Sequence, residues 1–336
     1  MRLGIGVSED LPVAQQQQIA RNVESHGFAS LWTNEARGRD AFVLCAAWAA
    51  ATSSLDVGVG VVPLWTRTPV QLAMGAATLQ DLSGGRFLLG LGVSHPVTMQ
   101  RWHDRSYTRP VTAARELLEL LEAIESGQRV RAEGDVFRVA DFQLEITSSA
   151  PPSRRYLAAM GPRMLELAGT HADGVLLNWS GPGEVERAAA IVRNAADRRG
   201  RGRADVEVAS YVRIAVGESR RSAQRALSRE IAKYARLDAY VEHFGRQGFS
   251  AMVDRVRALP PAAHVDNPDA LVTAVGDEAL GVLGWAGGPE DDPRKAVAAW
   301  RAAGLDHFIA RVVATGPDAG DDVARVVDRF SAMIDV

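Results

Sequence analysis

The sequence has almost no cysteine, no excess of charge and no long hydrophobic run. Cys45 is the only cysteine among 336 residues, which excludes an intramolecular disulfide framework and a cysteine-rich metal cluster. The 38 basic and 41 acidic residues leave a net charge of −3, so no overall field attracts nucleic acid or an anionic membrane. The apolar run Leu3–Val7 is too short for a signal peptide or a membrane span. We therefore expect a cytoplasmic protein that binds neither nucleic acid nor membrane.

Several common catalytic motifs are also missing. The chain contains no Walker sequence, no His-Glu-x-x-His pair and no Gly-x-Ser-x-Gly elbow. Gly58-Val-Gly60 and Gly90-Leu-Gly92 resemble the beginning of a dinucleotide fingerprint, but neither has the third glycine in register or opens directly into a capped helix. The seven histidines are scattered without the spacing of a metal site. These observations argue against Rossmann-type binding, and we predict no metal.

What the chain does contain is a regular alternation of short apolar runs and amphipathic stretches, which is typical of βα units around a parallel sheet. Counting gives eight candidate parallel strands, and a (β/α)8 TIM barrel needs about 250 residues. We therefore predict a single barrel domain over residues 1–336, with insertions at about 95–155, after strand 4, and at about 220–300, around strands 7 and 8. The predicted strands are Leu3–Val7, Ser30–Thr33, Leu55–Pro63, Arg86–Gly92, Tyr156–Ala159, Gly174–Leu177, Glu207–Val216 and His307–Val313.

Local signals set the ends of several helices. Asp10 is placed to cap the first helix, with Pro12 in its first turn, and Thr68 with Pro69 marks the start of another that Gly84 ends. Within the first insertion, residues 128–146 have the pattern of a hairpin that turns at Gly134-Asp135. Residues 220–300 are expected to contain helices and a Gly/Pro-rich stretch at 284–293.

In a barrel of this kind the active site is built from loops at the carboxyl ends of the strands. Five predicted strands end in aromatic, carboxylate, imidazole or amide side chains, which is the composition of a small-molecule cavity. The strand-end residues are Trp32, Glu35, Gly60, Trp65, Gly92, Ser94, His95, Asn178 and Trp179.

The remaining one of these five strand ends, Ala159-Met-Gly-Pro-Arg163, turns directly into a helix with Pro162 at its first position. The backbone N–H groups of Gly161, Arg163 and Met164 would point at an anion there, and the guanidinium of Arg163 would pair with it. Plain helix capping explains the same residues, and both interpretations remain open from this segment alone.

Four motifs together resemble the bacterial-luciferase-like oxidoreductases that use a flavin or deazaflavin, and the similarity is greatest to the branch that uses coenzyme F420. The resemblance covers residues 1–180 closely, 295–313 fairly well and 185–290 only in outline. The motifs are Ser83-Gly-Gly-Arg-Phe-Leu-Leu-Gly-Leu-Gly-Val-Ser-His95, Trp65-Thr-Arg-Thr-Pro69, Leu157-Ala-Ala-Met-Gly-Pro-Arg-Met-Leu-Glu-Leu-Ala168 with Ala172-Asp-Gly174, and Ala302-Ala-Gly-Leu-Asp-His307.

The resemblance implies the same barrel fold and a set of coenzyme contacts. A non-prolyl cis peptide at Gly60-Val61, in a bulge at the end of the third strand, would support the coenzyme ring. The phosphate of the coenzyme would lie near the turn Gly161–Arg163. The residues expected to bind coenzyme are Gly60, Val61, Gly92, Ser94, Ala159, Met160, Gly161, Pro162, Arg163 and Asn178. The family also implies a homodimer, for which the alanine-rich helices around residues 46–51 and 73–77 offer small packing faces.

The chain departs from the family at one position. Family members that act on sugar phosphates or alcohols carry a histidine directly after the acidic residue of the second strand, but here Glu35 is followed by Ala36. His95 or Glu35 would then supply the proton that accompanies hydride transfer, and His95 is preferred because imidazole titrates near neutral pH. The alternatives are a structural role for His95 as the partner of a backbone carbonyl and loop capping for Glu35.

The leading hypothesis is an F420-dependent oxidoreductase that transfers a hydride between the deazaflavin and a small organic substrate with a carbonyl, imine or activated alkene. Trp32, Trp65 and Trp179 would line the apolar substrate side, and residues 95–107 would form a lid that excludes water. An FMN-dependent luciferase-like monooxygenase is the first alternative. A non-catalytic barrel subunit is the second.

Overall fold

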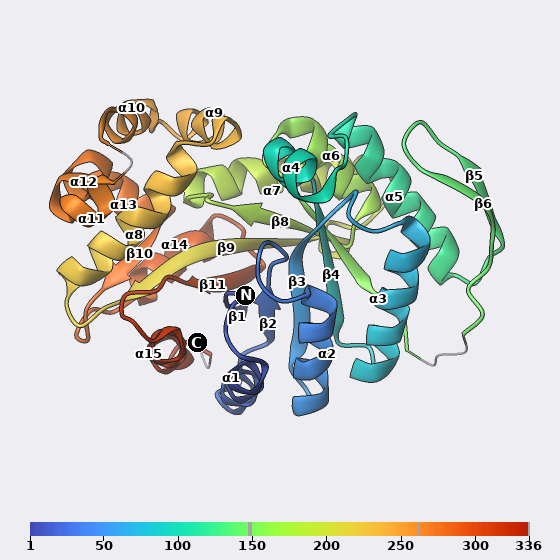
Figure 1. The fold of residues 1–336 in the computed structure, drawn as a ribbon, viewed down its shortest axis with the longest axis horizontal. Coiled ribbons are helices and arrows are strands. Elements are labelled where there is room, and N and C mark those ends of the chain that lie inside the picture. The colour runs from blue at the N-terminus through green and yellow to red at the C-terminus, as the bar shows by residue number, and fades with distance from the viewer. Residues whose placement is uncertain (147–149, 261, 335–336) are drawn as a thin grey trace. The chain divides into compact units, whose positions relative to one another are not determined.

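The computed structural model describes residues 1–146, 150–260 and 262–334, and it contains the predicted (β/α)8 barrel (Figure 1). The main sheet has the order β10-β9-β11-β1-β2-β3-β4-β7-β8, with a further pairing of β9 with β8 that closes it. All eight predicted strands are present, with ends shifted by at most two residues. They are β1 (Arg2–Gly6), β2 (Ser30–Thr33), β3 (Asp56–Pro63), β4 (Phe87–Gly92), β7 (Arg154–Ala158), β8 (Gly174–Asn178), β9 (Glu207–Val216) and β11 (His307–Val312).

By its internal contacts the chain separates into two compact units. One consists of residues 7–177 and 188–209, and the other of residues 1–6, 178–187 and 210–336. The first unit carries the strands β2, β3, β4 and β7 and most of β8. The second carries β1, β10, β11 and most of β9.

The barrel strands β2, β3, β4, β7 and β8 run parallel, and most of their side chains are buried on both faces because helices cover the outside. Figure 1 shows α1, α2 and α3 side by side along β2, β3 and β4. The register of β3 against β4 shifts between Val59 and Val62, so the end of β3 bulges as expected. The helices of the first unit are α1 (Val13–Ser25), α2 (Ala41–Ala51), α3 (Pro69–Ser83), α4 (Pro96–His103), α5 (Pro110–Glu125), α6 (Pro162–His171) and the greater part of α7 (Pro182–Arg198), together with the short 3₁₀ helix Arg203–Asp205.

The helix ends confirm two of the three local signals. Thr68 caps α3 in a capping box with Gln71, and Gly84 ends this helix in the left-handed conformation with φ 63°. The prediction for Asp10 is wrong, since the N-cap of α1 is Pro12 and no side chain caps this helix. The helix starts at Val13, so Asp10 lies ahead of the turn whose N–H groups a capping carboxylate would reach.

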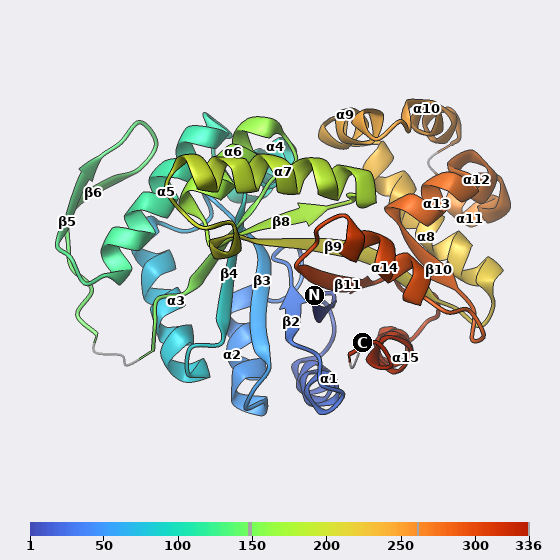
Figure 2. The same ribbon diagram turned by 180° about the vertical axis from the view of Figure 1, so that it is seen from behind.

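The predicted hairpin is also present, as β5 (Val130–Glu133) and β6 (Arg138–Phe142), and Figure 2 shows it beside α5. The carboxylate of Glu116 on α5 accepts hydrogen bonds from the backbone N–H groups of Asp135, Val136 and Phe137, at 2.9, 3.0 and 3.0 Å. This buried side chain therefore holds the hairpin turn onto the helix.

The second unit contains the other insertion, whose helices share an apolar core with Phe244, Leu227 and Leu271 at its centre. The sequence interpretation missed one strand here, β10 (Gly284–Gly287), which pairs in parallel with the end of β9. A Cβ at Gly284 would lie 2.6 Å from the carbonyl oxygen of Arg213, so glycine at this position permits the close pairing of β10 with β9. The helices are α8 (Arg220–Ala235), α9 (Asp238–Arg246), α10 (Ser250–Ala258), α11 (Ala263–Asp266), α12 (Pro268–Val275), α13 (Asp277–Leu283), α14 (Arg294–Ala302) and α15 (Ala319–Ser331).

Among the described residues, no helix combines the length and the apolar composition that crossing a membrane requires.

Candidate active site

The bulge of β3 forms the centre of the candidate site in the first unit. The peptide bond Gly60-Val61 is cis, as the family resemblance implies. Val61 packs on Gly92 of β4, where an added Cβ would lie 2.6 Å from Cγ2 of Val61 and 3.3 Å from Cβ of Ala158. The carbonyl of Gly92 accepts a hydrogen bond of 2.9 Å from the backbone N–H of Leu64. The carboxyl ends of β3, β4 and β7 are therefore packed against one another without intervening side-chain volume.

Glu35, which follows β2, is held by an arginine that the sequence interpretation did not single out. Nη1 of Arg67 donates to Oε1 of Glu35 at 2.6 Å, and Nη2 donates to Asp40 at 2.7 Å. The guanidinium also lies 4.7 Å from the centre of the Phe42 ring. The second carboxylate oxygen of Glu35, Oε2, is buried and has no hydrogen-bond partner within the described part of the chain. Arg67 thus fixes the carboxylate and leaves one acceptor atom unsatisfied.

Trp65 presents a matching unsatisfied donor at the end of β3. Its side chain is only 8% exposed, and the buried indole N–H makes no hydrogen bond to any described residue. The ring of Tyr107 lies 5.0 Å away, and burial raises the pKa of the Tyr107 hydroxyl. Buried polar groups without partners are rare in folded proteins, so a donor and an acceptor left open at neighbouring strand ends indicate a place for a ligand.

His95 is half-buried and occupies the N-cap of α4. Its Nδ1 accepts a hydrogen bond of 3.3 Å from the backbone N–H of Val97, so in the neutral ring the hydrogen is on Nε2. The preceding Ser94 is exposed and has φ 56°, a conformation that few residues other than glycine adopt. His95 therefore caps the helix through a backbone N–H and not through the backbone carbonyl of the structural alternative, and Nε2–H remains available as a donor.

The expected lid lies at the carboxyl ends of the strands. It contains α4, and the guanidinium of Arg37 after β2 lies 5.7 Å from the centre of the half-exposed Trp102 ring. At the other end of the segment, Tyr107 packs on Trp65 after β3. Both contacts join residues 95–107 to strand-end residues of the same unit, which is where a water-excluding segment has to be.

The turn 159–163 leaves the N-terminus of α6 open. Gly161 is the N-cap of α6, no side chain caps this helix, and a Cβ added at Gly161 would meet no atom within 4 Å. Arg163 is exposed and makes no ion pair with any carboxylate in the described ranges. Ala159 is buried and supports the turn through a 3.4 Å hydrogen bond from its N–H to the carbonyl of Leu176. Free N–H groups and an unpaired cation are the features that the anion-site interpretation requires.

Trp32 is placed inside the barrel core. It is completely buried, and its indole N–H donates to Oγ of Ser30 at 2.9 Å. A Cβ added at Gly58 would lie 2.6 Å from Cε3 of the Trp32 ring, so the ring occupies the space beside this glycine. The centres of the Trp32 and Tyr156 rings lie 5.3 Å apart, and the two rings pack edge to face. Trp32 therefore belongs to the core, whereas Trp65 follows the end of β3.

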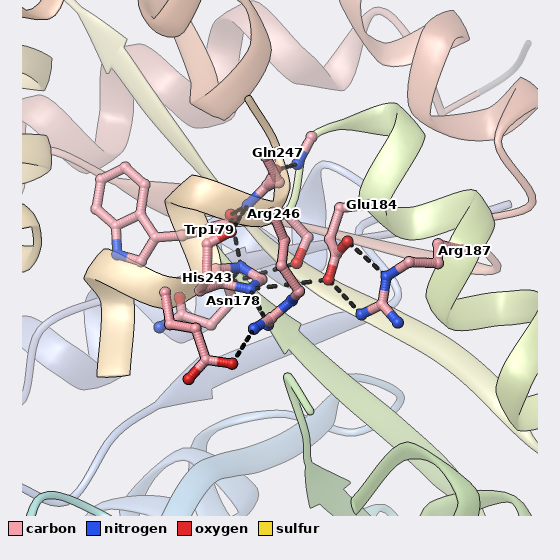
Figure 3. Close-up of polar contacts among 10 residues, drawn as sticks. Asn178, Trp179, Glu184, Arg187, His243, Arg246 and Gln247 are labelled. Atoms are coloured by element: carbon pink, nitrogen blue, oxygen red, sulfur yellow. Dashed lines mark hydrogen bonds and ion pairs between the residues drawn. The ribbon is translucent and has the colours of Figure 1, made fainter. Parts of the chain in front are cut away.

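Asn178 and Trp179 belong to the second unit, in which a buried polar network holds the turn they form (Figure 3). Trp179 is completely buried and has φ 54°. Its carbonyl oxygen accepts hydrogen bonds from Nε2 of His243 at 3.0 Å and from Nε2 of Gln247 at 2.9 Å. Oε1 of Gln247 accepts from the N–H of Gly181 at 2.9 Å. The network stabilises a backbone conformation that tryptophan rarely adopts.

The same network contains an ion pair of a buried carboxylate with a half-buried arginine, which the sequence interpretation missed. Glu184 is 7% exposed and receives two hydrogen bonds from Arg187, at 2.8 and 2.6 Å. His243 lies 3.7 Å from the same carboxylate, and burial lowers its pKa although Glu184 opposes the shift. His243 therefore acts as a neutral donor to the turn. His243 and Gln247 lie in the region where the family resemblance holds only in outline, so no motif identified them.

A family model described as luciferase-like monooxygenase matches residues 2–307. The chain is 29% identical over 267 residues to the 5,10-methylenetetrahydromethanopterin reductase of Methanolobus tindarius, covering 79% of this chain and 78% of the relative. It is 28% identical over 358 residues to a Mycobacterium tuberculosis protein that is provisionally named a coenzyme F420-dependent oxidoreductase, covering 97% and 99% of the two chains.

Among solved structures, the fold is similar to that of the coenzyme F420-dependent tetrahydromethanopterin reductase of Methanopyrus kandleri. The TM-score is 0.79 at 22% identity, with 98% of this chain and 97% of the other covered. The match of the family model over most of the chain, together with the barrel and the bulge at the end of β3, shows that this protein is a member of the luciferase-like monooxygenase family.

Proposed function

We propose that the protein is an F420-dependent oxidoreductase that transfers a hydride between the deazaflavin and a small organic substrate with a carbonyl, imine or activated alkene. The observation that carries the proposal is the pair of unsatisfied buried atoms, Oε2 of Glu35 and Nε1 of Trp65, at the ends of adjacent strands. A heterocycle with both an N–H group and a carbonyl satisfies both atoms, and a deazaflavin ring carries both. The relatives named above support the choice of F420.

The remaining parts of the coenzyme also have matching residues in this unit. Gly60, Val61 and Gly92 form the packed bulge against which a flat ring can lie. The open turn Ala159–Arg163 offers N–H donors and a guanidinium to a phosphate. The bound coenzyme would supply the hydride chemistry. The chain itself then orients the ring, closes residues 95–107 over it and donates a proton from Nε2 of His95.

Titration of the purified protein with each coenzyme tests the proposal. We expect saturable binding of F420 in the nanomolar-to-micromolar range and much weaker binding of FMN. The alternative is an FMN-dependent monooxygenase, which the description of the family favours. Tight binding of FMN without binding of F420 would establish that alternative. Failure to bind either coenzyme at saturating concentration would favour a non-catalytic barrel.

Replacing Arg163 by glutamine is expected to weaken F420 binding about three- to fivefold, because an exposed charge pair contributes up to about 1 kcal/mol. The dissociation constant should be measured at two salt concentrations, and the wild-type protein should lose affinity at the higher one. Arg131→Gln is the matched control, since Arg131 is an exposed arginine on β5. Equal affinities of the wild-type protein and Arg163→Gln would exclude a phosphate contact at Arg163.

Glu35→Gln is expected to lower turnover by about two- to fivefold, which is less than the loss expected at His95. Glutamine keeps the size of the side chain and an oxygen acceptor for Arg67, but it removes the carboxylate charge. Asp40→Asn provides the control because it changes the other carboxylate on Arg67 and retains an N-cap acceptor for α2. Steady-state kcat should distinguish the two variants. A larger loss in Glu35→Gln than in His95→Ala would make Glu35 the proton donor.

We further propose a homodimer. Part of the alanine face expected from the sequence is internal, because Ala49, Ala73 and Ala76 are buried against the barrel. The neighbouring helices α2 and α3 nevertheless expose Val43 and Met74, at 66% and 49%. Sedimentation at micromolar concentration should give the mass of two chains.

Val43→Glu should shift this species toward one chain, while Ile146→Glu, at a similarly exposed apolar residue, should not. A wild-type protein that sediments as a monomer would exclude the dimer.

A further inference from the structure

In the second unit, Arg213 on β9 is buried without a negative partner. The residue is 6% exposed, and no carboxylate of the described residues lies within 4.0 Å of its guanidinium. Other arginines of this unit pair with acids, as Arg187 does with Glu184 and Arg225 with Asp269. Burying a guanidinium costs free energy that an acidic partner normally offsets. Arg213 has no such partner among the described residues, so its charge is available to another negatively charged group.

Other arginines without an acidic partner use the negative ends of helices instead. Arg236 donates to the carbonyls of Val256 and Leu259 at the end of α10, at 3.1 and 2.9 Å. The two side-chain hydrogen bonds of Arg213 do not go to a helix end. Nη1 donates to Oδ1 of Asn178, and Nη2 donates to the hydroxyl of Tyr234 at 3.4 Å. Both acceptors are neutral, and two bonds leave three of the five guanidinium N–H groups without a described acceptor.

Aromatic rings around Arg213 hold the guanidinium in place. Its central carbon lies 4.4 Å from the centre of the Trp179 ring, 5.5 Å from that of Tyr234 and 6.0 Å from that of Tyr211. Cation–π contacts of this kind stabilise a desolvated cation. They leave its hydrogen-bonding capacity unused, so the guanidinium is positioned in advance for a planar acceptor.

The side chains beside Arg213 supply hydrogen-bond donors but no negative charge. Nδ2 of Asn178 donates to the hydroxyl of Tyr240 at 2.7 Å, and the rings of Tyr234 and Tyr240 are 4.7 Å apart. Neither phenolic O–H donates to a described residue. Burial and the neighbouring Tyr234 raise the pKa of Tyr240, although Arg213 opposes the shift, so the hydroxyl keeps its proton. One cation and two free O–H groups thus form a cluster rich in donors.

We propose that Arg213, Tyr234 and Tyr240 bind an anionic group, a carboxylate or a phosphate, of the substrate. Asn178 is the last residue of β8, and Arg213 lies in the second half of β9, so the cluster stands toward the carboxyl ends of its strands, where ligands of barrel enzymes bind. Its identification as a substrate contact rests on the proposed function. The binding of an anion is independent of that function.

Thermal unfolding of the purified full-length protein at constant ionic strength tests the anion site. Inorganic phosphate and succinate are the two probes, and at least one should raise the melting temperature saturably in the wild-type protein. Arg213→Met should weaken that effect at least about tenfold, which corresponds to about 1.4 kcal/mol of binding free energy. Arg236→Met is the matched control and should keep it. Stabilisation by neither probe, or equal stabilisation of Arg213→Met, would overturn the proposal.

Tyr240→Phe provides a second variant should Arg213→Met not fold. It removes one donor and keeps the ring packing, so anion binding should weaken several-fold. Wild-type affinity in this variant would count against the cluster. Titration with F420 assigns the anion to its source, and Arg213→Met should bind the coenzyme as the wild-type protein does. A tenfold loss of F420 affinity would show that Arg213 serves the coenzyme, and would overturn the assignment to the substrate.

The same experiment separates the two proposals. A wild-type protein that binds the anion but not F420, with the anion binding lost in Arg213→Met, contradicts the proposed function and supports the site at Arg213. A wild-type protein that binds F420 but neither anion supports the proposed function and contradicts the inference about Arg213.

Discussion

His95→Ala is expected to lower turnover at least about tenfold and to change coenzyme affinity by no more than a few-fold. A positioned acid contributes about 10²–10⁴-fold to a step in which negative charge develops, and Nε2 of His95 is the ring nitrogen that the helix cap leaves free to hold and donate a proton. The binding of the coenzyme does not depend on this proton, so the loss should appear in kcat. Steady-state kinetics and a coenzyme titration measure the two quantities.

The variant also removes a helix cap, and a second substitution separates the two effects. Nδ1 of His95 accepts from the N–H of Val97, and loss of an N-cap acceptor typically costs about 1 kcal/mol of stability. Asparagine is among the best N-cap residues and has no titrating imidazole. His95→Asn should therefore keep the stability of α4 and still lose turnover. Full turnover in His95→Asn would show that His95 acts only as a cap.

The second large effect is expected at Gly90, under the bulge of β3. A Cβ at this position would lie 2.3 Å from the carbonyl oxygen of Val59 and 3.1 Å from Cα of Gly60. Both neighbours are backbone atoms of the central sheet, which cannot move aside as the end of a flexible side chain can. Gly90→Ala should lower the free energy of unfolding by about 3 kcal/mol, at the upper end of the cost of overpacking. Chemical denaturation measures the loss.

Gly183→Ala is the matched control for this measurement. A Cβ at Gly183 meets no atom within 4 Å, and the residue lies in the first turn of α7. Alanine favours the helical conformation by about 1 kcal/mol over glycine, so this variant should be as stable as the wild-type protein or slightly more so. If Gly90→Ala were as stable as Gly183→Ala, there would be room for a methyl group at Gly90, and the close packing of β3 on β4 described above would be contradicted.

The packing at Gly90 is expected to affect coenzyme binding as well as stability. The bulge at Val59–Val62 brings β3 close enough to β4 that only hydrogen fits at Gly90, and the same bulge presents Gly60 and Val61 at the strand end. A Gly90→Ala protein that still folds is therefore expected to bind F420 more weakly as well. The coenzyme titration on the folded fraction measures this effect.

The sequence by itself determined the order and type of most elements in the barrel. Apolar runs such as 174–177 are long enough to span a buried strand, and the helix stripes between them repeat with the helical period. Thr68 with Gln71 and Gly84 define the ends of α3 through contacts between residues that are close in the chain. These features depend on local conformation and on which side chains avoid water, so they can be predicted without knowledge of distant neighbours.

Only the tertiary structure decided which side chains meet. Glu35 pairs with Arg67 from the following strand end, Trp32 turns into the core, and Arg213 is surrounded by residues of β8, α8 and β9. Periodicity identifies the buried face of an element, but it does not specify the partner from another element that faces a given atom. Whether a buried charge or indole N–H is satisfied depends on that partner. The unpaired atoms of Glu35, Trp65 and Arg213 therefore became visible only once the chain was folded.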